Sequence, residues 1–447
     1  MAPVEDEDLP LSEPAPSGNC RRSCVLVALL LSGLVGASAY SLDATRGQRV
    51  VNAVREVEEA GLQVSDLHLP PGGPNGADDL KAAAATFNSA LPSDVSLMCG
   101  VDPVTLAKGL KDPSSEDGQL VYMRDQPNSP ATIQKALTLF VGVVDQIAPQ
   151  IEEGLSKEVV WAADFETQGF EADYDFVTFS ELAGALVVRA GARMLEGDSA
   201  GAYADLELCL ALAKTATVPT VMGRLMRNAC VDGSLFLLEG LLTLGPPPPP
   251  EQRARILREL RAFEADFGLT RPFLGELHAA RLLPDTPRLS GLPKEHRGLG
   301  ARVSYGSWRA NYVELLAKCV LASRQPPQEV HRFLGSLRQE EGGGPYREGV
   351  VTSFPQVEAK NRQALARLRV AIRAIELLDL AELPQSLTDM PYDACLFDKR
   401  RCNYRLDAER AVLWSVGPDE FDQAGVSAQD SDGASDDYPF RIPRPKR

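Results

Sequence analysis

The sequence predicts a mostly α-helical protein that ends in a small α+β cap. From Ser129 to Leu380, apolar residues recur at the three- and four-residue spacing of amphipathic helices, and Pro- or Gly-containing stops separate the periodic stretches. Strand signals are sparse until Tyr404, where a short apolar run follows a polar loop. The expected architecture is a membrane-anchor helix, then a stack of tetratricopeptide-like α-hairpins, then the cap.

Length and charge narrow the classes of function. A chain of 447 residues is long enough for two or three domains with separate cores. Its net charge of −16 disfavours nucleic acid and anionic lipid as partners, because phosphate binding needs clustered Lys and Arg. We therefore expect protein partners and no nucleic acid.

The N-terminal region carries a signal for membrane insertion. Residues 1–22 are acidic and Pro-rich, and we expect them to form a disordered cytoplasmic segment. Residues 23–42 are uncharged, and as a helix of about 30 Å they are long enough to cross a bilayer. Arg21 and Arg22 place the N-terminus in the cytoplasm, so the remainder is expected on the other side. The small residues 37–39 also fit a cleavage site, which leaves open whether the anchor is removed.

Helices are predicted in two successive regions after the anchor. Residues 43–128 are expected to form an irregular α region that begins with an amphipathic helix. An α-hairpin domain follows over residues 129–244. Ser129 and Pro130 are a capping residue and a favoured first helical residue, and they open a helix that runs to Glu153.

Two helices joined by Gly197 and Asp198 form the clearest unit of the α-hairpin domain. Small residues recur along both helices and allow close packing, and the pattern resembles a tetratricopeptide-type hairpin. The prolines at 246–250 end the domain, and a second helical segment is predicted over residues 251–345. Residues 356–443 are expected to form a long helix and the cap.

Three motifs follow one another in the C-terminal region. A Pro-bounded turn, Leu383-Pro384-Gln385-Ser386-Leu387, precedes the apolar strand Leu413-Trp414-Ser415-Val416-Gly417-Pro418-Asp419, and an acidic segment closes with Asp436-Asp437 and Phe440. This order resembles the C-terminal region of type II secretion pseudopilins. It is also similar to that of large membrane-anchored bacterial proteins with the same tail.

The resemblance implies a long helix followed by β-structure and an acidic loop that binds Ca²⁺. Together with the anchor, it implies a bacterial inner (cytoplasmic) membrane protein whose C-terminal region is periplasmic. Two departures from the pseudopilin pattern matter for the calcium loop: Glu420-Phe421 follow Asp419 where the family has Gly, and Gln423-Ala424-Gly425 replace a Gly-Gly. Residues 18–21 also lack the prepilin cleavage motif. The chain is therefore not expected to be a pilin subunit.

The acidic tail is a candidate calcium site. A loop wraps Ca²⁺ with oxygen ligands at alternating positions around a Gly, and the tail repeats that spacing around Gly433. The candidate ligands are Asp419, Asp422, Asp430, Asp432, Asp436 and Asp437. The alternative is an acidic extension that binds no ion.

Cys395 and Cys402 bracket a polar loop ahead of the final strands. On the oxidising side of a membrane, a disulfide between them would fix the entry to the strand and stabilise the fold by roughly 2–3 kcal/mol. Zinc is the competing interpretation, but the sequence offers no second pair of ligands nearby.

No phosphate loop or dinucleotide fingerprint nominates a catalytic residue in this chain. The first hypothesis for function is therefore a membrane-tethered extracytoplasmic scaffold that binds other proteins. The second is a hydrolase whose carboxylates converge only in three dimensions, with Asp164, Glu166, Asp173 and Asp175 as candidates. The third is a calcium-stabilised subunit of an envelope or secretion assembly.

Overall fold

The computed structural model describes residues 44–63, 75–92, 95, 98–112, 129–161, 176–216, 220–282, 299–337, 353–417, 421–426 and 437–444. Within these residues the protein is mostly helical, as predicted, with a small three-stranded antiparallel sheet near the C-terminus. The helices are a first helix at residues 44–59, α2 (Gly76–Ala90), α3 (Pro103–Lys111), α5 (Pro130–Ser156), α7 (Phe176–Leu195), α8 (Ser199–Thr215), α9 (Val221–Leu244), α10 (Pro250–Ala265), α11 (Thr270–Leu282), α12 (Leu299–Ala322), α13 (Pro327–Ser336) and α15 (Ser353–Leu377). The strands are β1 (Asn403–Leu406), β2 (Arg410–Ser415) and β3 (Tyr438–Pro443).

Side-chain caps set where several helices begin. The Ser129 hydroxyl oxygen accepts a hydrogen bond from the Thr132 N–H at 3.2 Å, and Pro130 is the first residue of α5. Asp102 and Asp198 cap α3 and α8 through their carboxylates. Each cap satisfies amide groups that the start of a helix leaves without an intrahelical partner.

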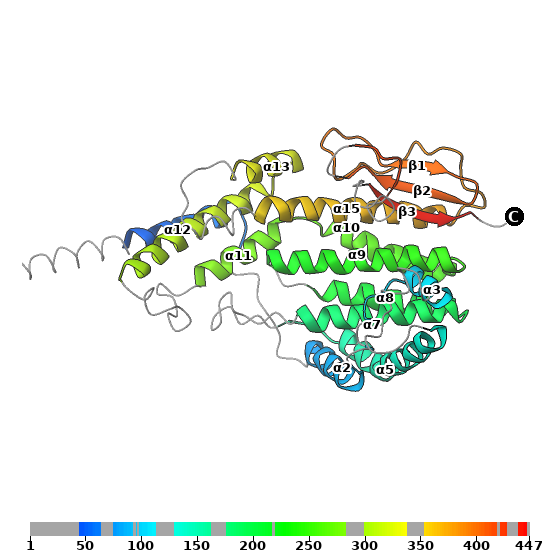
Figure 1. The fold of residues 1–447 in the computed structure, drawn as a ribbon. Helices are drawn as coiled ribbons and strands as arrows, with labels where there is room; N and C mark the ends of the chain where they lie inside the picture. The colour runs from blue at the N-terminus through cyan, green and yellow to red at the C-terminus, as the bar shows by residue number, and fades with distance from the viewer. Residues whose placement is uncertain are drawn as a thin grey trace, which may run out of the picture.

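The helices lie in stacked layers. Figure 1 shows α2 and α5 on one side of the molecule, α7 and α8 next to them, then α9, and α15 between α9 and the sheet. One hydrophobic core runs through these layers and reaches the sheet, and a second, smaller core joins the first helix to α11, α12 and α13. Leu238 and Leu368 lie in the first core, while Val221 and Val357 lie in the second. Helices α9 and α15 therefore connect the two cores.

The sheet has the strand order β1-β2-β3, and the central strand β2 is buried on both faces. Ala411 and Leu413 pack into the main core on the inner face. Trp414 points to the outer face and lies under the segment 421–426. Gly425 in that segment has φ +75°, and a Cβ there would lie 3.1 Å from ring atoms of Trp414. The close cover over Trp414 therefore requires a glycine.

Two sequence-based predictions about the N-terminal region are withdrawn. Among the described residues, no helix combines the length and the apolar character needed to cross a membrane. The expected anchor, residues 23–42, lies outside the described residues, as does the segment 1–22. The single-pass anchor and the bacterial inner-membrane location that depends on it are not retained.

The predicted disulfide between Cys395 and Cys402 is also wrong, because both residues are buried free thiols. Burial raises the pKa of Cys395 to about 12, and it raises the pKa of Cys402 as well. Backbone hydrogen bonds fix the loop between them instead. The Asp393 N–H donates to the Arg400 carbonyl and the Cys402 N–H to the Pro391 carbonyl, both at 2.9 Å.

Glycines let α2 and α5 touch through their backbones. A Cβ added at Gly76 would lie 2.0 Å from the Gly154 carbonyl oxygen, and one at Gly154 would lie 2.9 Å from the Gly76 carbonyl oxygen. Any larger residue at either position would push the two helices apart, since protein interiors are close-packed.

Replacing Gly154 with Ala should lower the free energy of unfolding by about 1–3 kcal/mol, because the added methyl group separates α2 from α5. Gly142 in the same helix is the matched control, since nothing lies within 4 Å of a Cβ built there. Ala at position 142 should stabilise the protein by up to about 1 kcal/mol through its higher helix propensity. Urea unfolding of both variants checks this, and equal effects would contradict the close approach of the helices.

Candidate functional site

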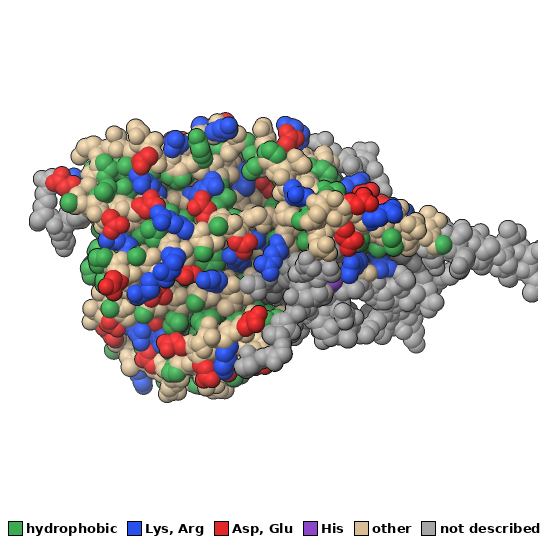
Figure 2. Space-filling model, turned by 180° about the vertical axis from the view of Figure 1, so that it is seen from behind, with side chains coloured by type: hydrophobic (Ala, Val, Ile, Leu, Met, Phe, Trp, Pro, Cys, Tyr) green, Lys and Arg blue, Asp and Glu red, His purple; other side chains and the backbone are tan. Residues whose placement is uncertain are grey.

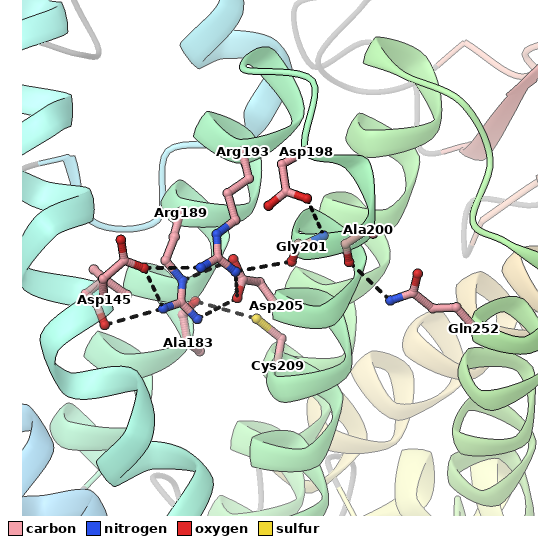
Figure 3. Close-up of polar contacts among 11 residues, drawn as sticks. Asp145, Ala183, Arg189, Arg193, Asp198, Ala200, Gly201, Asp205, Cys209 and Gln252 are labelled. Atoms are coloured by element: carbon pink, nitrogen blue, oxygen red, sulfur yellow. Dashed lines mark hydrogen bonds and ion pairs between the residues drawn. The ribbon is translucent and has the colours of Figure 1, made fainter.

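A buried charge cluster joins α5, α7 and α8, and Figure 3 shows its four charged side chains pointing toward one another. Arg189 and Arg193 lie one turn apart on α7, Asp205 on α8 and Asp145 on α5. Arg189 donates to both carboxylate oxygens of Asp205, from Nε at 3.1 Å and from Nη2 at 2.5 Å. Its Nη1 lies 3.1 Å from Asp145 Oδ1. Arg193 reaches the same two carboxylates, at 3.1 Å from Asp205 and 3.2 Å from Asp145.

The inner half of the charge cluster is closed to solvent. The side chains of Arg189 and Asp205 are 2% and 1% exposed, whereas that of Asp145 is 49% exposed. Burial raises the pKa of Asp205, and the guanidiniums of Arg189 and Arg193 oppose that shift. Two positive charges face two negative ones, so each buried charge has a partner. We interpret the cluster as an ionic contact that fixes three helices relative to one another, because its four charged groups are all paired among themselves.

Neighbouring contacts fix the turn between α7 and α8 beside the charge cluster (Figure 3). The Asp198 carboxylate accepts from the Gly201 N–H at 2.9 Å, and Gln252 of α10 donates to the Ala200 carbonyl at 3.4 Å. Arg193 Nη1 also lies 3.5 Å from the Gly201 carbonyl oxygen. The turn is therefore held from both the cluster side and the α10 side.

A second buried carboxyl, Glu276 of α11, lies at the start of α9. Its Oε1 accepts a hydrogen bond from the Val221 N–H at 3.0 Å, and the residue is 8% exposed. Burial raises the pKa of Glu276 to about 7, against the smaller opposing effect of the Val221 hydrogen bond. A carboxyl with this pKa can exchange a proton near neutrality, but its geometry makes it a brace for the first turn of α9.

Asp393 holds the cysteine loop onto the end of β2. Its carboxylate accepts from the Cys395 N–H at 2.9 Å, the Ser415 hydroxyl at 2.8 Å and the Val416 N–H at 3.0 Å. Asp393 is 2% exposed, and these bonds satisfy a carboxylate that would otherwise be costly to bury. Sequence reasoning missed this residue, because nothing local distinguishes it from the other acidic loop residues.

Two contacts attach the cap to the helices. Arg362 of α15 donates to the Cys395 carbonyl at 2.7 Å and lies over the Phe397 ring, 4.5 Å from its centroid. At the β3 edge of the sheet, Glu239 of α9 accepts from the backbone N–H of Arg441 at 3.2 Å and from its Nη1 at 3.1 Å. The sheet is thus fixed to α9 and α15. The face of the sheet that does not pack on the helices is directed away from them (Figure 1).

Aromatic and arginine side chains share this outer face of the cap. Arg401 pairs with Tyr392 in an antiparallel bridge and lies over its ring, 4.9 Å from the centroid. Arg405 is four residues further along, on the same face, and lies 5.6 Å from the Trp414 ring centroid. Phe421 is 73% exposed and Tyr392 51% exposed. We call Tyr392, Arg401, Arg405 and Phe421 the outer patch.

Two of the six predicted calcium ligands are described, and both brace the segment beside the outer patch. The Asp422 carboxylate accepts from the Trp414 indole N–H at 2.9 Å, the Asn403 amide at 3.2 Å and the Ala424 N–H at 2.8 Å. Asp437 accepts from the Gly425 N–H at 2.8 Å.

The other predicted site residues lie outside the described residues. These are the calcium candidates Asp419, Asp430, Asp432 and Asp436 and the hydrolase candidates Asp164, Glu166, Asp173 and Asp175. Where the structure is described, no three His, Cys, Asp or Glu side chains gather as a metal site would require. Calcium binding stays a prediction.

Comparison of the chain with protein-family models, with curated proteins and with solved structures finds no match. A functional proposal therefore rests on the residues of the chain itself.

Arg189→Met should lower the free energy of unfolding by about 3–5 kcal/mol, because it leaves Asp205 buried beside a weaker set of partners. The double variant Arg189→Met/Asp205→Leu removes both buried charges and should lose less than the sum of the two single variants. Urea denaturation of the two single variants and the double variant measures this coupling. Strictly additive losses would mean that the two side chains do not form a pair.

Glu276→Gln should change how stability depends on pH. The native carboxyl has a pKa of about 7 and the unfolded one about 4.3, so the native state holds a proton that the unfolded state releases between these values. The stability of the natural protein should therefore fall as pH rises through this window, by about 4 kcal/mol from this group. Gln keeps the acceptor for Val221, so its advantage over Glu should grow from pH 5 to pH 8. If the difference in unfolding free energy between the two proteins did not change with pH, the raised pKa of Glu276 would be refuted.

Proposed function

We propose that this chain is a non-catalytic interaction protein, in which helical layers hold a small cap and the outer patch of that cap binds a protein partner. The observation that carries the proposal is the composition of the patch. Two strongly exposed aromatic residues belong to the patch: Tyr392 lies on one face with Arg401 and Arg405, and Phe421 directly precedes Asp422, which binds Trp414 on that face. Aromatic residues and Arg are enriched at protein interfaces and supply most of the binding energy there.

The surroundings of the outer patch suit a binding surface. Asn403 and Trp414 both donate to Asp422, and the Asp422 carboxylate also accepts from the Ala424 N–H, so the segment that carries Phe421 is held in place. Tyr392 is held by its bridge to Arg401. An interface whose side chains are positioned in advance loses less conformational entropy when it binds.

Two features support the finer description of the scaffold. Helices α7 and α8 pack as an antiparallel hairpin about Gly197, where φ is +89°, which agrees with a tetratricopeptide-like unit. The long helix α15 packs against a three-stranded antiparallel sheet, which agrees with a pseudopilin-like C-terminal region. The terms tetratricopeptide-like and pseudopilin-like describe how helices and strands are arranged, and neither implies a reaction.

The back of the molecule gives a weaker signal for a partner. Figure 2 shows the face opposite to that in Figure 1, where acidic, basic and apolar side chains are interspersed over the coloured residues. A mixed surface of this kind is typical of solvated protein exteriors. The outer patch is therefore the better candidate for binding.

A photo-crosslinking amino acid at position 421 tests the proposal in cells of the source organism. It should give a discrete cross-linked product with another protein, and charge reversal of Arg401 and Arg405 should reduce that product. The same amino acid at Met222, which is 50% exposed on α9, is the control position. Equal cross-linking at both positions, or a product at 421 that is unaffected by charge reversal, would contradict the outer patch as the binding surface.

A further inference from the structure

The two edges of the cap sheet differ in their capacity to accept another strand. In antiparallel pairing, alternate residues direct their N–H and C=O groups toward the neighbouring strand and away from it. The Arg444 N–H donates to the Glu409 carbonyl at 2.9 Å next to the β2–β3 pairing. Counting back from Arg444 in steps of two, the N–H and C=O groups of Ile442, Phe440 and Tyr438 point toward β2. Those of positions 439, 441 and 443 point outward.

The outer edge of β3 is closed to further pairing. Positions 439 and 443 are prolines and have no N–H to donate. The Arg441 N–H, the remaining outward donor in the strand, binds Glu239 of α9 at 3.2 Å. Each outward donor of β3 is thus either absent or already used. Proline and side-chain capping are common ways to protect a sheet edge.

Within the described residues, the outer edge of β1 is open. The Asp407 N–H donates to the Arg410 carbonyl at 2.8 Å, so the same alternation directs Asn403 and Arg405 toward β2 and turns the backbone of Tyr404 and Leu406 outward. The Cys402 N–H is already bonded to the Pro391 carbonyl. In the described part of the chain, β1 is the end strand of the sheet and no segment pairs with it beyond Cys402. Pairing along this edge therefore ends at Cys402 and Pro391, and residues 404–406 are the next stretch where a further strand could pair.

Charge indicates which kind of strand this edge accepts. Residues 398–410 contain five basic and three acidic side chains, a local net charge of +2 in a chain whose net charge is −16. On an added strand, side chains on the outer face would lie beside Arg405, which also pairs with Asp407 at 2.8 Å, and would point toward Arg401. Alternate side chains would lie beside Tyr404 and Leu406, which pack at the margin of the main core. Acidic residues suit the first set and apolar residues the second.

A second copy of this chain suits the same edge poorly. Antiparallel pairing of two β1 strands with Arg405 opposite Arg405 would bring like charges together, which is destabilising. An acidic strand from a different protein meets no such repulsion.

We infer that the outer edge of β1 binds an extended segment of another protein in which acidic and apolar residues alternate, and that this segment pairs with Tyr404 and Leu406 as an added strand. The inference rests on the proposed interaction function and specifies the partner of the same cap. Binding by strand addition uses backbone hydrogen bonds for affinity and alternate side chains for specificity.

The test uses the full chain and a blocked peptide, Thr-Glu-Val-Glu-Val-Glu-Thr, with isothermal titration and fluorescence anisotropy as readouts. Saturable binding is expected, and Leu406→Pro should weaken it about tenfold by removing an outward donor at the edge. Circular dichroism should show that this variant stays folded, although loss of the Leu406 side chain from the margin of the main core lowers its melting temperature. Arg405→Glu should weaken it by a similar factor, about tenfold. Arg332→Glu, at a side chain 64% exposed on α13, is the matched control and should leave affinity unchanged.

A second experiment modifies the peptide and leaves the protein unaltered. N-methylation of one alternate set of peptide amides should abolish binding, and methylation of the other set should not, because only one set faces β1. Equal effects of the two sets, or binding that persists with Leu406→Pro, would overturn strand addition while leaving the outer patch and its cross-linking test untouched. The absence of peptide binding would overturn the inference as well. A concentration-dependent dimer that Leu406→Pro abolishes would assign the edge to a second copy and equally overturn it.

Discussion

The packing of α9 against α15 is the constraint on which the rest of the structure depends. The Asn228 amide of α9 donates to Asn361 Oδ1 of α15 at 3.1 Å, and the Asn361 amide donates to the Phe267 carbonyl at 2.9 Å. Both asparagines are buried, so a sliding of either helix would leave polar groups without partners inside the core. This fixed register joins the two hydrophobic cores, and it also places the Arg362 and Glu239 side chains that hold the cap.

Buried charge performs a similar task at the other side of the molecule. The Arg189–Asp205 pair costs desolvation energy that its own attraction offsets only in part, so its value lies in selecting one arrangement of α5, α7 and α8. Arg193 extends the pair toward solvent through Asp145. These four charges therefore balance one another within the helical layers.

Local rules predicted much of the helical part of the chain and little of the cap. The Ser129-Pro130 start and the Gly197-Asp198 turn were readable because capping and left-handed turns depend on neighbours in the sequence. The thiol state of Cys395 was not readable. It depends on burial and on a loop held by Asp393, and both are products of tertiary packing.

The candidate site divides in the same way. The sequence marked Asp422 and Asp437 as carboxylates near the end of the chain, but the structure uses both to hold the 421–426 segment, a role set by Trp414 and Gly425 on other elements. The outer patch combines residues from a loop, a strand and a covering segment. No local period connects them, so only the fold brings Tyr392, Arg405 and Phe421 onto one face.

The difference between the open β1 edge and the closed β3 edge determines where the cap can accept another strand. Residue-resolved hydrogen exchange, by mass spectrometry with electron-transfer fragmentation, measures it directly on the unmodified protein. The amides of Tyr404 and Leu406 should exchange rapidly, while those of Asn403, Arg405 and Arg441 should exchange slowly because each is hydrogen-bonded. Uniform protection along residues 403–406 would show that the β1 edge is already covered and would contradict strand addition there.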